Sequence, residues 1–127
     1  MKKTITWFEI YVGDIDRAKQ FYSEVFGYKL TEIEMANERH SDMRYATFGV
    51  DGQEGVVGGA LVKMDAAKPG IGGTLVYFDS DGINAELSRV EAAGGKILRS
   101  KQAVGAFGYI ALIEDTEGNL IGLRSAS

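Results

Sequence analysis

An order of predicted elements that occurs twice most constrains the fold of this chain. The first copy is a strand, a helix and three strands, predicted at 5–12, 15–26, 28–35, 45–50 and 56–64. The second copy begins about 66 residues further on. Its elements are predicted at 73–79, 83–93, 96–104, 109–114 and 119–125. Since each half alone would expose one face of its sheet, we expect the two to pair.

The prediction is therefore a single α+β domain over residues 1–127. It consists of two tandem βαβββ modules, at about 4–64 and 73–126, which form a curved mixed sheet, a cup, with the helices outside. Signals for the helix ends support this division. Asp14 and Asp81 stand where N-caps are expected, and Gly27 and Gly94 where helices end.

Composition excludes several classes of function. The chain has no cysteine, which removes disulfide scaffolds, thiolate nucleophiles and zinc fingers, and fits a cytoplasmic protein. His40 is its single histidine, so a site with two histidines cannot form within one chain. The net charge is −4 and the sequence has neither a basic cluster nor a long apolar run. We therefore expect neither nucleic acid nor a membrane as a partner.

The element order and several local strings resemble the vicinal oxygen chelate superfamily. This superfamily groups glyoxalases, extradiol dioxygenases, fosfomycin-modifying enzymes and bleomycin-resistance proteins, and sequences like this one are usually described as uncharacterised glyoxalase-like proteins. The likeness covers essentially the whole chain. Its strings are Trp7-Phe8-Glu9-Ile10, Asp14-Ile15-Asp16-Arg17-Ala18, Phe21-Tyr22, Val25-Phe26-Gly27, Gly58-Gly59-Ala60-Leu61, Ala93-Gly94-Gly95-Lys96 and Glu114-Asp115-Thr116-Glu117-Gly118-Asn119.

The resemblance also indicates where a metal would be held. Metal-dependent members place one His, Glu or Gln on each of four strands, facing into the cup. The corresponding positions here fall on Trp7, Gly73, Gly122 and either Gly59 or Ala60. None of these side chains suits a divalent metal. We therefore expect no metal and no other cofactor.

Alternation along the strands gives the set that should face into the cup. Trp7, Glu9 and Tyr11 share one face of the first strand, while Phe8, Ile10 and Val12 turn to the helices. By the same rule Gly73, Leu75 and Tyr77 point inward from the fifth strand, and Leu120, Gly122 and Arg124 from the last. Such an aromatic-rich hollow with few polar groups is typical of small-molecule sites. The candidate ligand-binding residues are Trp7, Glu9, Tyr11, Tyr77 and Arg124.

Each candidate has an alternative role. Glu9 is the candidate catalytic base or ligand acceptor, or it pairs with Arg124 or lies in solvent. Arg124 clamps an anionic group or is simply solvated. Trp7, Tyr11 and Tyr77 stack on a flat ligand or serve as ordinary packing.

Other segments favour structural interpretations. His40 lies in a polar loop at 36–42, and Phe107 lies on a glycine-flanked loop; either loop closes over the cup or serves no such role. The glycines at 55–59 and 70–73 match no phosphate-binding motif and suggest strand bends. The charges of the first helix, Arg17 among them, indicate a solvated face.

Three hypotheses follow for function. The first is a metal-free binding protein for a small apolar or aromatic molecule, which the resemblance implies to be a homodimer. The second is a lyase, isomerase or dioxygenase-like enzyme that uses Glu9 as a general base or holds manganese, iron, nickel or zinc in an atypical site. The third is a structural or interaction role, which a filled cup would favour.

Overall fold

The computed structural model describes residues 7–33, 43–48, 58–65, 67–72 and 75–127. The first module contains β1 (Trp7–Tyr11), α1 (Ile15–Phe26), β2 (Thr31–Ile33), β3 (Arg44–Thr47) and β4 (Gly58–Lys63). The second contains β5 (Val76–Asp79), α2 (Ile83–Val90), β6 (Lys96–Ala103), the short helix η2 (Gly105–Phe107), β7 (Tyr109–Glu114) and β8 (Leu120–Ser125). The predicted order of elements is confirmed.

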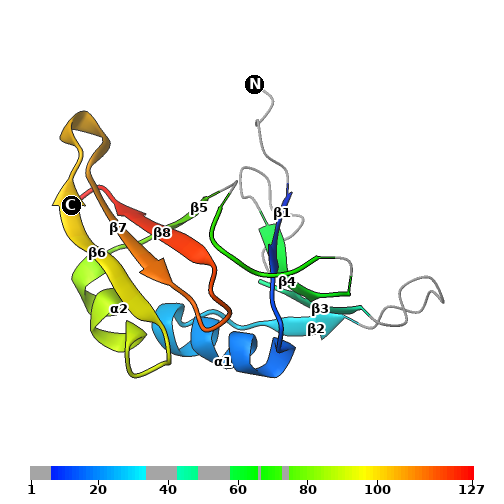
Figure 1. Cartoon of the computed structure of the whole chain (residues 1–127). Coiled ribbons are helices and arrows are strands. Elements are labelled where there is room, and N and C mark those ends of the chain that lie inside the picture. The colour runs from blue at the N-terminus through cyan, green and yellow to red at the C-terminus, as the bar shows by residue number, and fades with distance from the viewer. Residues whose placement is uncertain (1–6, 34–42, 49–57, 66, 73–74) are drawn as a thin grey trace.

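The strands form two four-stranded mixed sheets of the same topology. Their orders are β1-β4-β3-β2 and β5-β8-β7-β6. In each sheet the first and last strands of the module pair in parallel, and the other pairs are antiparallel. Figure 1 shows the two sheets on either side of the molecule, with both helices along one side. The predicted fold class, two tandem βαβββ modules, is confirmed.

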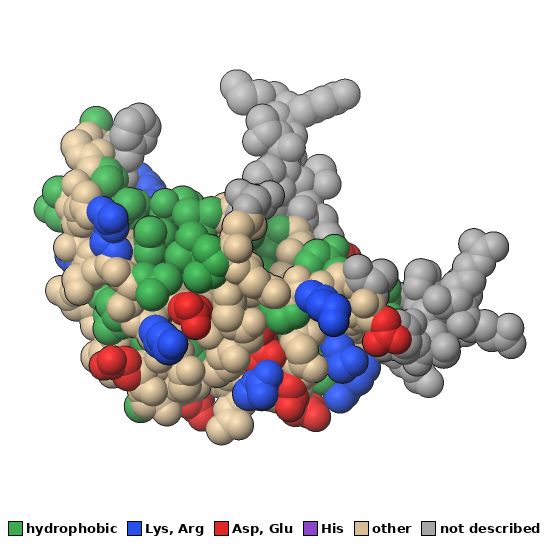
Figure 2. Space-filling view, in the orientation of Figure 1, with side chains coloured by type: hydrophobic (Ala, Val, Ile, Leu, Met, Phe, Trp, Pro, Cys, Tyr) green, Lys and Arg blue, Asp and Glu red, His purple; other side chains and the backbone are tan. Residues whose placement is uncertain are grey.

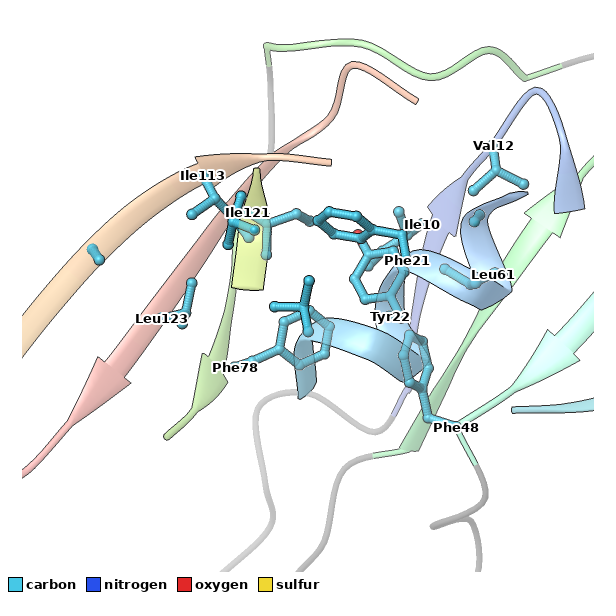
Figure 3. Packing of buried hydrophobic residues seen from close by; sticks show 14 of the residues in the cluster. Ile10, Val12, Phe21, Tyr22, Phe48, Leu61, Phe78, Ile113, Ile121 and Leu123 are labelled. Atoms are coloured by element: carbon cyan, nitrogen blue, oxygen red, sulfur yellow. The ribbon is translucent and has the colours of Figure 1, made fainter. Parts of the chain in front are cut away.

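The hydrophobic core lies between the helices and both sheets (Figure 3). Helix α1 contributes its apolar stripe, which includes the fully buried Phe21 and Tyr22. Burying side chains of this size contributes about 1.5–3 kcal/mol each. Phe8 contacts Phe48 of the first module and Phe78 of the second, with ring centroids 5.5 and 5.8 Å apart. Aromatic packing therefore joins the modules.

The two helices begin differently. Asp14 caps α1 by accepting a hydrogen bond from the Arg17 amide at 3.0 Å, and Gly27 ends it with φ 75°, as predicted. For α2 the prediction of Asp81 as the cap is wrong. The N-cap is Gly82, whose amide donates to Ser80 Oγ at 3.0 Å. Asp81 lies one residue too early, because the helix starts only at Ile83. No helix in the described ranges is long and apolar enough to cross a membrane.

Several strands are shorter than predicted. Strand β2 begins at Thr31 rather than at Tyr28, because Tyr28 continues the core and stacks on Phe26 at 5.3 Å. Strand β5 begins at Val76, and β6 is interrupted by register shifts. The polar loop at 36–42 with His40, the glycines at 55–57 and Gly73 lie outside the described residues.

Candidate functional site

Each sheet has a face turned away from the main core, and strand register defines its residues. We call the face of the first sheet the first open face: Glu9, Tyr11, Thr31, Ile33, Tyr45, Thr47, Ala60 and Val62. The second open face belongs to the second sheet: Tyr77, Asp79, Ile110, Leu112, Glu114, Leu120, Gly122 and Arg124. The neighbouring positions Ile10, Ala46, Leu61 and Ile121 belong to the core, which confirms the predicted alternation.

Glu9 is held by two tyrosines on the first open face. The hydroxyl of Tyr11 donates to Glu9 Oε1 at 3.1 Å, and that of Tyr45 donates to Glu9 Oε2 at 2.9 Å. Tyr11 lies two residues after Glu9 on β1, whereas Tyr45 lies on β3, and β4 separates β1 from β3. We call these three residues the Glu9 cluster.

The strand beneath the cluster explains how it forms. Strands β1 and β3 lie about 10 Å apart, since each neighbouring pair is separated by about 4.8 Å. Strand β4 presents Ala60 and Val62 between them, and neither side chain is large enough to keep Glu9 and Tyr45 apart. Both residues are fully buried, although neither belongs to the main core cluster. The first open face therefore has a packed layer of its own.

The first open face carries an unbalanced negative charge in its described part. Glu9 is the only Asp, Glu, Lys, Arg or His in that part, and Arg44 and Lys63 alternate to the opposite side. Arg44 instead contacts Glu32 at 2.7 Å and Asp16 at 3.3 Å. The hydrogen bond to Glu9 raises the pKa of Tyr11. This tyrosine therefore stays protonated and donates at neutral pH.

The second open face is largely apolar. Figure 2 shows hydrophobic side chains gathered over β7 and β8. Tyr77 is 46% exposed and lies opposite Gly122, where an added Cβ atom would be 2.4 Å from Tyr77 Cδ1. Its ring thus occupies the space that a side chain at Gly122 would need. Arg124 lies between Asp79 and Ile110 on the neighbouring strands.

The structure brings together only part of the predicted site. Glu9 and Tyr11 are joined by a hydrogen bond, whereas Tyr77 and Arg124 lie on the other sheet. Trp7 lies in β1, opposite Gly58. The sequence-based prediction did not include Tyr45. Alternation along β3 could have predicted which face of the sheet Tyr45 lies on, but only the register with β4 shows that it reaches Glu9.

The family's metal positions do not supply a ligand set here. Register resolves the ambiguity on β4: Gly59 faces the core against Phe8, while Ala60 lies on the first open face. Gly122 is covered by Tyr77. Glu9 shares the first open face with Ala60, and both of its oxygens accept tyrosine hydrogen bonds. Among the residues whose placement is described, no group of three or more His, Cys, Asp or Glu could hold a metal ion.

The turn between β7 and β8 fastens the modules to each other. Glu117 Oε1 accepts hydrogen bonds from the amides of Gly13 and Asp14, and Arg17 donates to Glu117 Oε2 at 2.7 Å. Burial opposes ionisation of Glu117, but these bonds outweigh it and hold its pKa at about 2. Arg17 is 54% exposed, as expected for a solvated helix face, and it additionally pairs with the carboxylate of this turn.

A buried polar network continues from the same turn. Asp115 accepts a hydrogen bond from the hydroxyl of Tyr22 at 2.8 Å and another from the Asn119 side chain at 3.1 Å. Burial raises the pKa of Asp115, and its hydrogen bonds offset part of that effect. Asn119 also donates to the Tyr11 carbonyl at 2.7 Å and accepts from the Gly70 amide at 2.8 Å. The network ties β1, α1 and the linker to β8.

Comparison with known proteins agrees with this architecture. The model of the Glyoxalase/Bleomycin resistance protein/Dioxygenase superfamily matches residues 4–123. A protein of Vibrio parahaemolyticus named probable lactoylglutathione lyase is 28% identical over 115 residues, which cover 88% of this chain and 83% of that protein.

Two solved structures share the fold at low identity. TnmS3, an antibiotic binding protein from Streptomyces sp. CB03234, has a TM-score of 0.67 and 24% identity, and the alignment covers 99% of this chain and 98% of that one. A glyoxylase/bleomycin resistance protein/dioxygenase domain from Frankia sp. EAN1pec has a TM-score of 0.71 and 16% identity, with complete coverage of both chains.

Proposed function

Because the chain belongs to the Glyoxalase/Bleomycin resistance protein/Dioxygenase superfamily, we propose that it is a metal-free binding protein for a small, largely apolar or aromatic molecule. The ligand lies on the open faces of the sheets. Glu9, Tyr11 and Tyr45 provide its polar contacts, and Trp7, Tyr77 and Arg124 remain candidate contacts. Such a combination of apolar surface and a few placed polar groups is typical of small-molecule sites.

One observation carries the metal-free part of this proposal. The glycine at the metal-ligand position on β8, Gly122, is packed against the ring of Tyr77, where even a Cβ atom would be 2.4 Å away. An aromatic ring thus stands where metal-dependent relatives would need a ligating side chain. The ring is partly exposed and offers a surface on which a flat molecule can stack.

The enzyme alternative is supported by the relatives named probable lactoylglutathione lyase. It requires either an atypical manganese, iron, nickel or zinc site or proton abstraction by Glu9. The cluster favours binding over this role, because both oxygens of Glu9 accept hydrogen bonds from tyrosines. A substrate proton would have to compete with these donors.

The proposal includes a cytoplasmic homodimer. Tyr77 and Leu98 are 46% and 47% exposed on the second sheet, which is a large exposure for such apolar side chains. A second copy would cover this surface and complete a cup around the ligand. Sedimentation velocity over a range of protein concentrations tests the dimer directly.

Metal content tests the metal-free part of the function. Tag-free protein is dialysed against manganese, iron, nickel and zinc together and then against metal-free buffer, and bound metal is measured by mass spectrometry. Less than about a tenth of an equivalent per chain supports the proposal. Close to one equivalent overturns it and favours the enzyme.

Ligand binding tests the remaining part. A library of small neutral aromatic molecules is screened by ligand-observed NMR against the protein and against Tyr77→Ala. Ile71→Ala is the matched control, since Ile71 is an exposed apolar residue of the linker. We expect some of these molecules to bind the wild-type protein. Their binding signal should weaken with Tyr77→Ala but not with Ile71→Ala. A library without a single binder overturns the proposal.

A further inference from the structure

The charge and chemistry of the Glu9 cluster point to the class of ligand. We propose that the cluster recognises an organic ammonium group, so that the molecule bound on the first open face is a small cation with an apolar or aromatic body. This inference rests on the proposed binding function and specifies its ligand.

The first step of the argument is charge complementarity. In the described part of the first open face, Glu9 is the only Asp, Glu, Lys, Arg or His, and it forms no ion pair with another described residue. The acids on the other side of the sheet, Glu32 and Asp16, are matched by Arg44. A carboxylate on a face without a described cationic partner attracts a cationic ligand and repels an anionic one.

The second step concerns how the carboxylate is held. Each oxygen accepts a hydrogen bond from one tyrosine hydroxyl, Oε1 from Tyr11 on β1 and Oε2 from Tyr45 on β3. The carboxylate is thereby fixed in place before any ligand arrives, which reduces the entropy that binding costs. Each oxygen keeps acceptor capacity for a further donor, because a carboxylate has about four lone-pair sites. An ammonium group has two or three donors to offer.

The third step is the aromatic surroundings. Tyr11 and Tyr45 both reach Glu9 through their hydroxyls, so two aromatic side chains lie beside the carboxylate that would accept from the cation. Aromatic rings stabilise ammonium groups electrostatically, particularly where water is partly excluded. Beneath them, Ala60 and Val62 are fully buried and support the cluster from the strand between β1 and β3.

A bare metal cation fits the cluster less well. A divalent metal requires several protein ligands, and neighbouring Ala60, Val62 and Thr47 supply no carboxylate or imidazole. An ammonium group needs only the Glu9 carboxylate as an acceptor and the tyrosine side chains beside it.

The test compares three probes of similar shape at pH 7: phenethylammonium, 2-phenylethanol and phenylacetate. Their dissociation constants are measured by protein-observed NMR titration at low salt. We expect phenethylammonium to bind about tenfold more tightly than 2-phenylethanol, and phenylacetate to bind most weakly. In Glu9→Gln the affinity for phenethylammonium should fall to that of the alcohol. Tyr45→Phe should weaken the ammonium two- to fivefold and leave the alcohol nearly unchanged.

The matched control is Glu24→Gln, which makes the same charge change on α1, where Glu24 contacts only Gln20 in the recorded hydrogen bonds. It should leave the preference for the ammonium intact. If Glu9→Gln fails to fold, the wild-type protein still gives an answer, because the carboxyl carbon-13 resonance of Glu9 should shift on addition of phenethylammonium and not of the alcohol.

Equal affinity of wild-type protein for ammonium and alcohol overturns the inference, and so does a Glu9→Gln variant that retains the preference. In both cases the proposed binding function stands, because the alcohol still binds. If the ammonium fails to bind while neutral molecules from the aromatic library do, the inference alone fails. If neither these probes nor the library bind, the inference and the proposed function fail together.

Discussion

The ring of Tyr77 on β5 is packed so closely over Gly122 on β8 that a Cβ atom on Gly122 would lie 2.4 Å from Tyr77 Cδ1. The two residues are register partners in a parallel pair and therefore share a face of the sheet. The absence of a side chain at Gly122 is what lets the tyrosine lie down across its neighbouring strand. Packing thus provides a physical reason for glycine at a position where the family's metal-dependent members place a ligand.

Gly122→Ala should destabilise the protein by about 1 kcal/mol, because the added methyl group displaces the Tyr77 ring. Tyr77 is half exposed and can move away, which limits the cost. In a Tyr77→Ala background the same change should cost almost nothing, so a double-mutant cycle in urea should give a coupling energy close to the whole effect. Additive single effects would contradict this account.

Gly59→Ala provides a comparison with a confined neighbour. Its Cβ atom would lie 2.5 Å from the ring of Phe8, which is partly buried and packed against Phe48 and Phe78, so it has less room to move than the half-exposed Tyr77. We expect a loss of about 2–3 kcal/mol, more than for Gly122→Ala, measured by the same urea denaturation. A smaller loss at Gly59 than at Gly122 would show that the core yields more easily than the open face.

Protonation of Glu117 should make the protein less stable as the pH falls. Hydrogen bonds from Arg17, Thr116 and the amides of Asp14 and Gly13 hold the pKa of Glu117 at about 2 against the effect of burial, below its ordinary value of 4.5. Its stabilising contribution is therefore complete above about pH 4.5 and is lost as the pH falls towards about 2. A depression of this size corresponds to at most about 3 kcal/mol.

Denaturation of wild-type protein and Glu117→Gln between pH 7 and pH 2 measures this contribution. The difference in unfolding free energy should be largest at pH 7 and should shrink steadily below about pH 4.5. Glu24→Gln is the control, since Glu24 is exposed on α1 and contacts Gln20. A difference for Glu117→Gln that stays constant across this range would show that the ionised carboxylate does not hold the modules together.

Tyr22→Phe should cost about 1–2 kcal/mol, because it removes a buried hydrogen bond of 2.8 Å to Asp115. Since burial already raises the pKa of Asp115 and the bond from Tyr22 lowers it, the variant should raise this pKa further. Because the Tyr22 hydroxyl stabilises the ionised form of Asp115 more than the protonated form, the loss of stability should be greater at neutral pH than at acid pH. Carbon-13 NMR titration of the Asp115 carboxyl group checks the direction. Tyr77→Phe, whose hydroxyl is outside this network, should leave the titration unchanged.

Local signals made most of the fold predictable. The periodicity of α1, its Asp14 cap and Gly27 are all properties of neighbouring residues, and they were predicted correctly. Alternation also placed Phe8 and Ile10 in the core. The N-cap of α2 was assigned to the wrong residue because Ser80 and Gly82 supply the turn that Asp81 was expected to make.

The candidate site is formed by residues that are far apart in the sequence, and local sequence patterns do not show which of them come into contact. Tyr45 reaches Glu9 across β4. Arg17 forms an ion pair with Glu117, which lies 100 residues away in the sequence. Neither pairing can be inferred until the register and the packing of the modules are known. Sequence could therefore nominate Glu9 as a candidate, but only the structure supplies its partners.

Asn119→Ala should loosen the connection between the modules and the linker. The side chain accepts from the Gly70 amide at 2.8 Å and donates to the Tyr11 carbonyl at 2.7 Å, so alanine leaves both backbone groups without this partner. We expect a loss of about 2 kcal/mol in unfolding free energy and faster hydrogen exchange at Gly70. Asn84→Ala, on the exposed side of α2, should change neither quantity. Unchanged exchange at Gly70 in Asn119→Ala would mean that the linker is held by other contacts, and that the β7–β8 turn fastens only the modules.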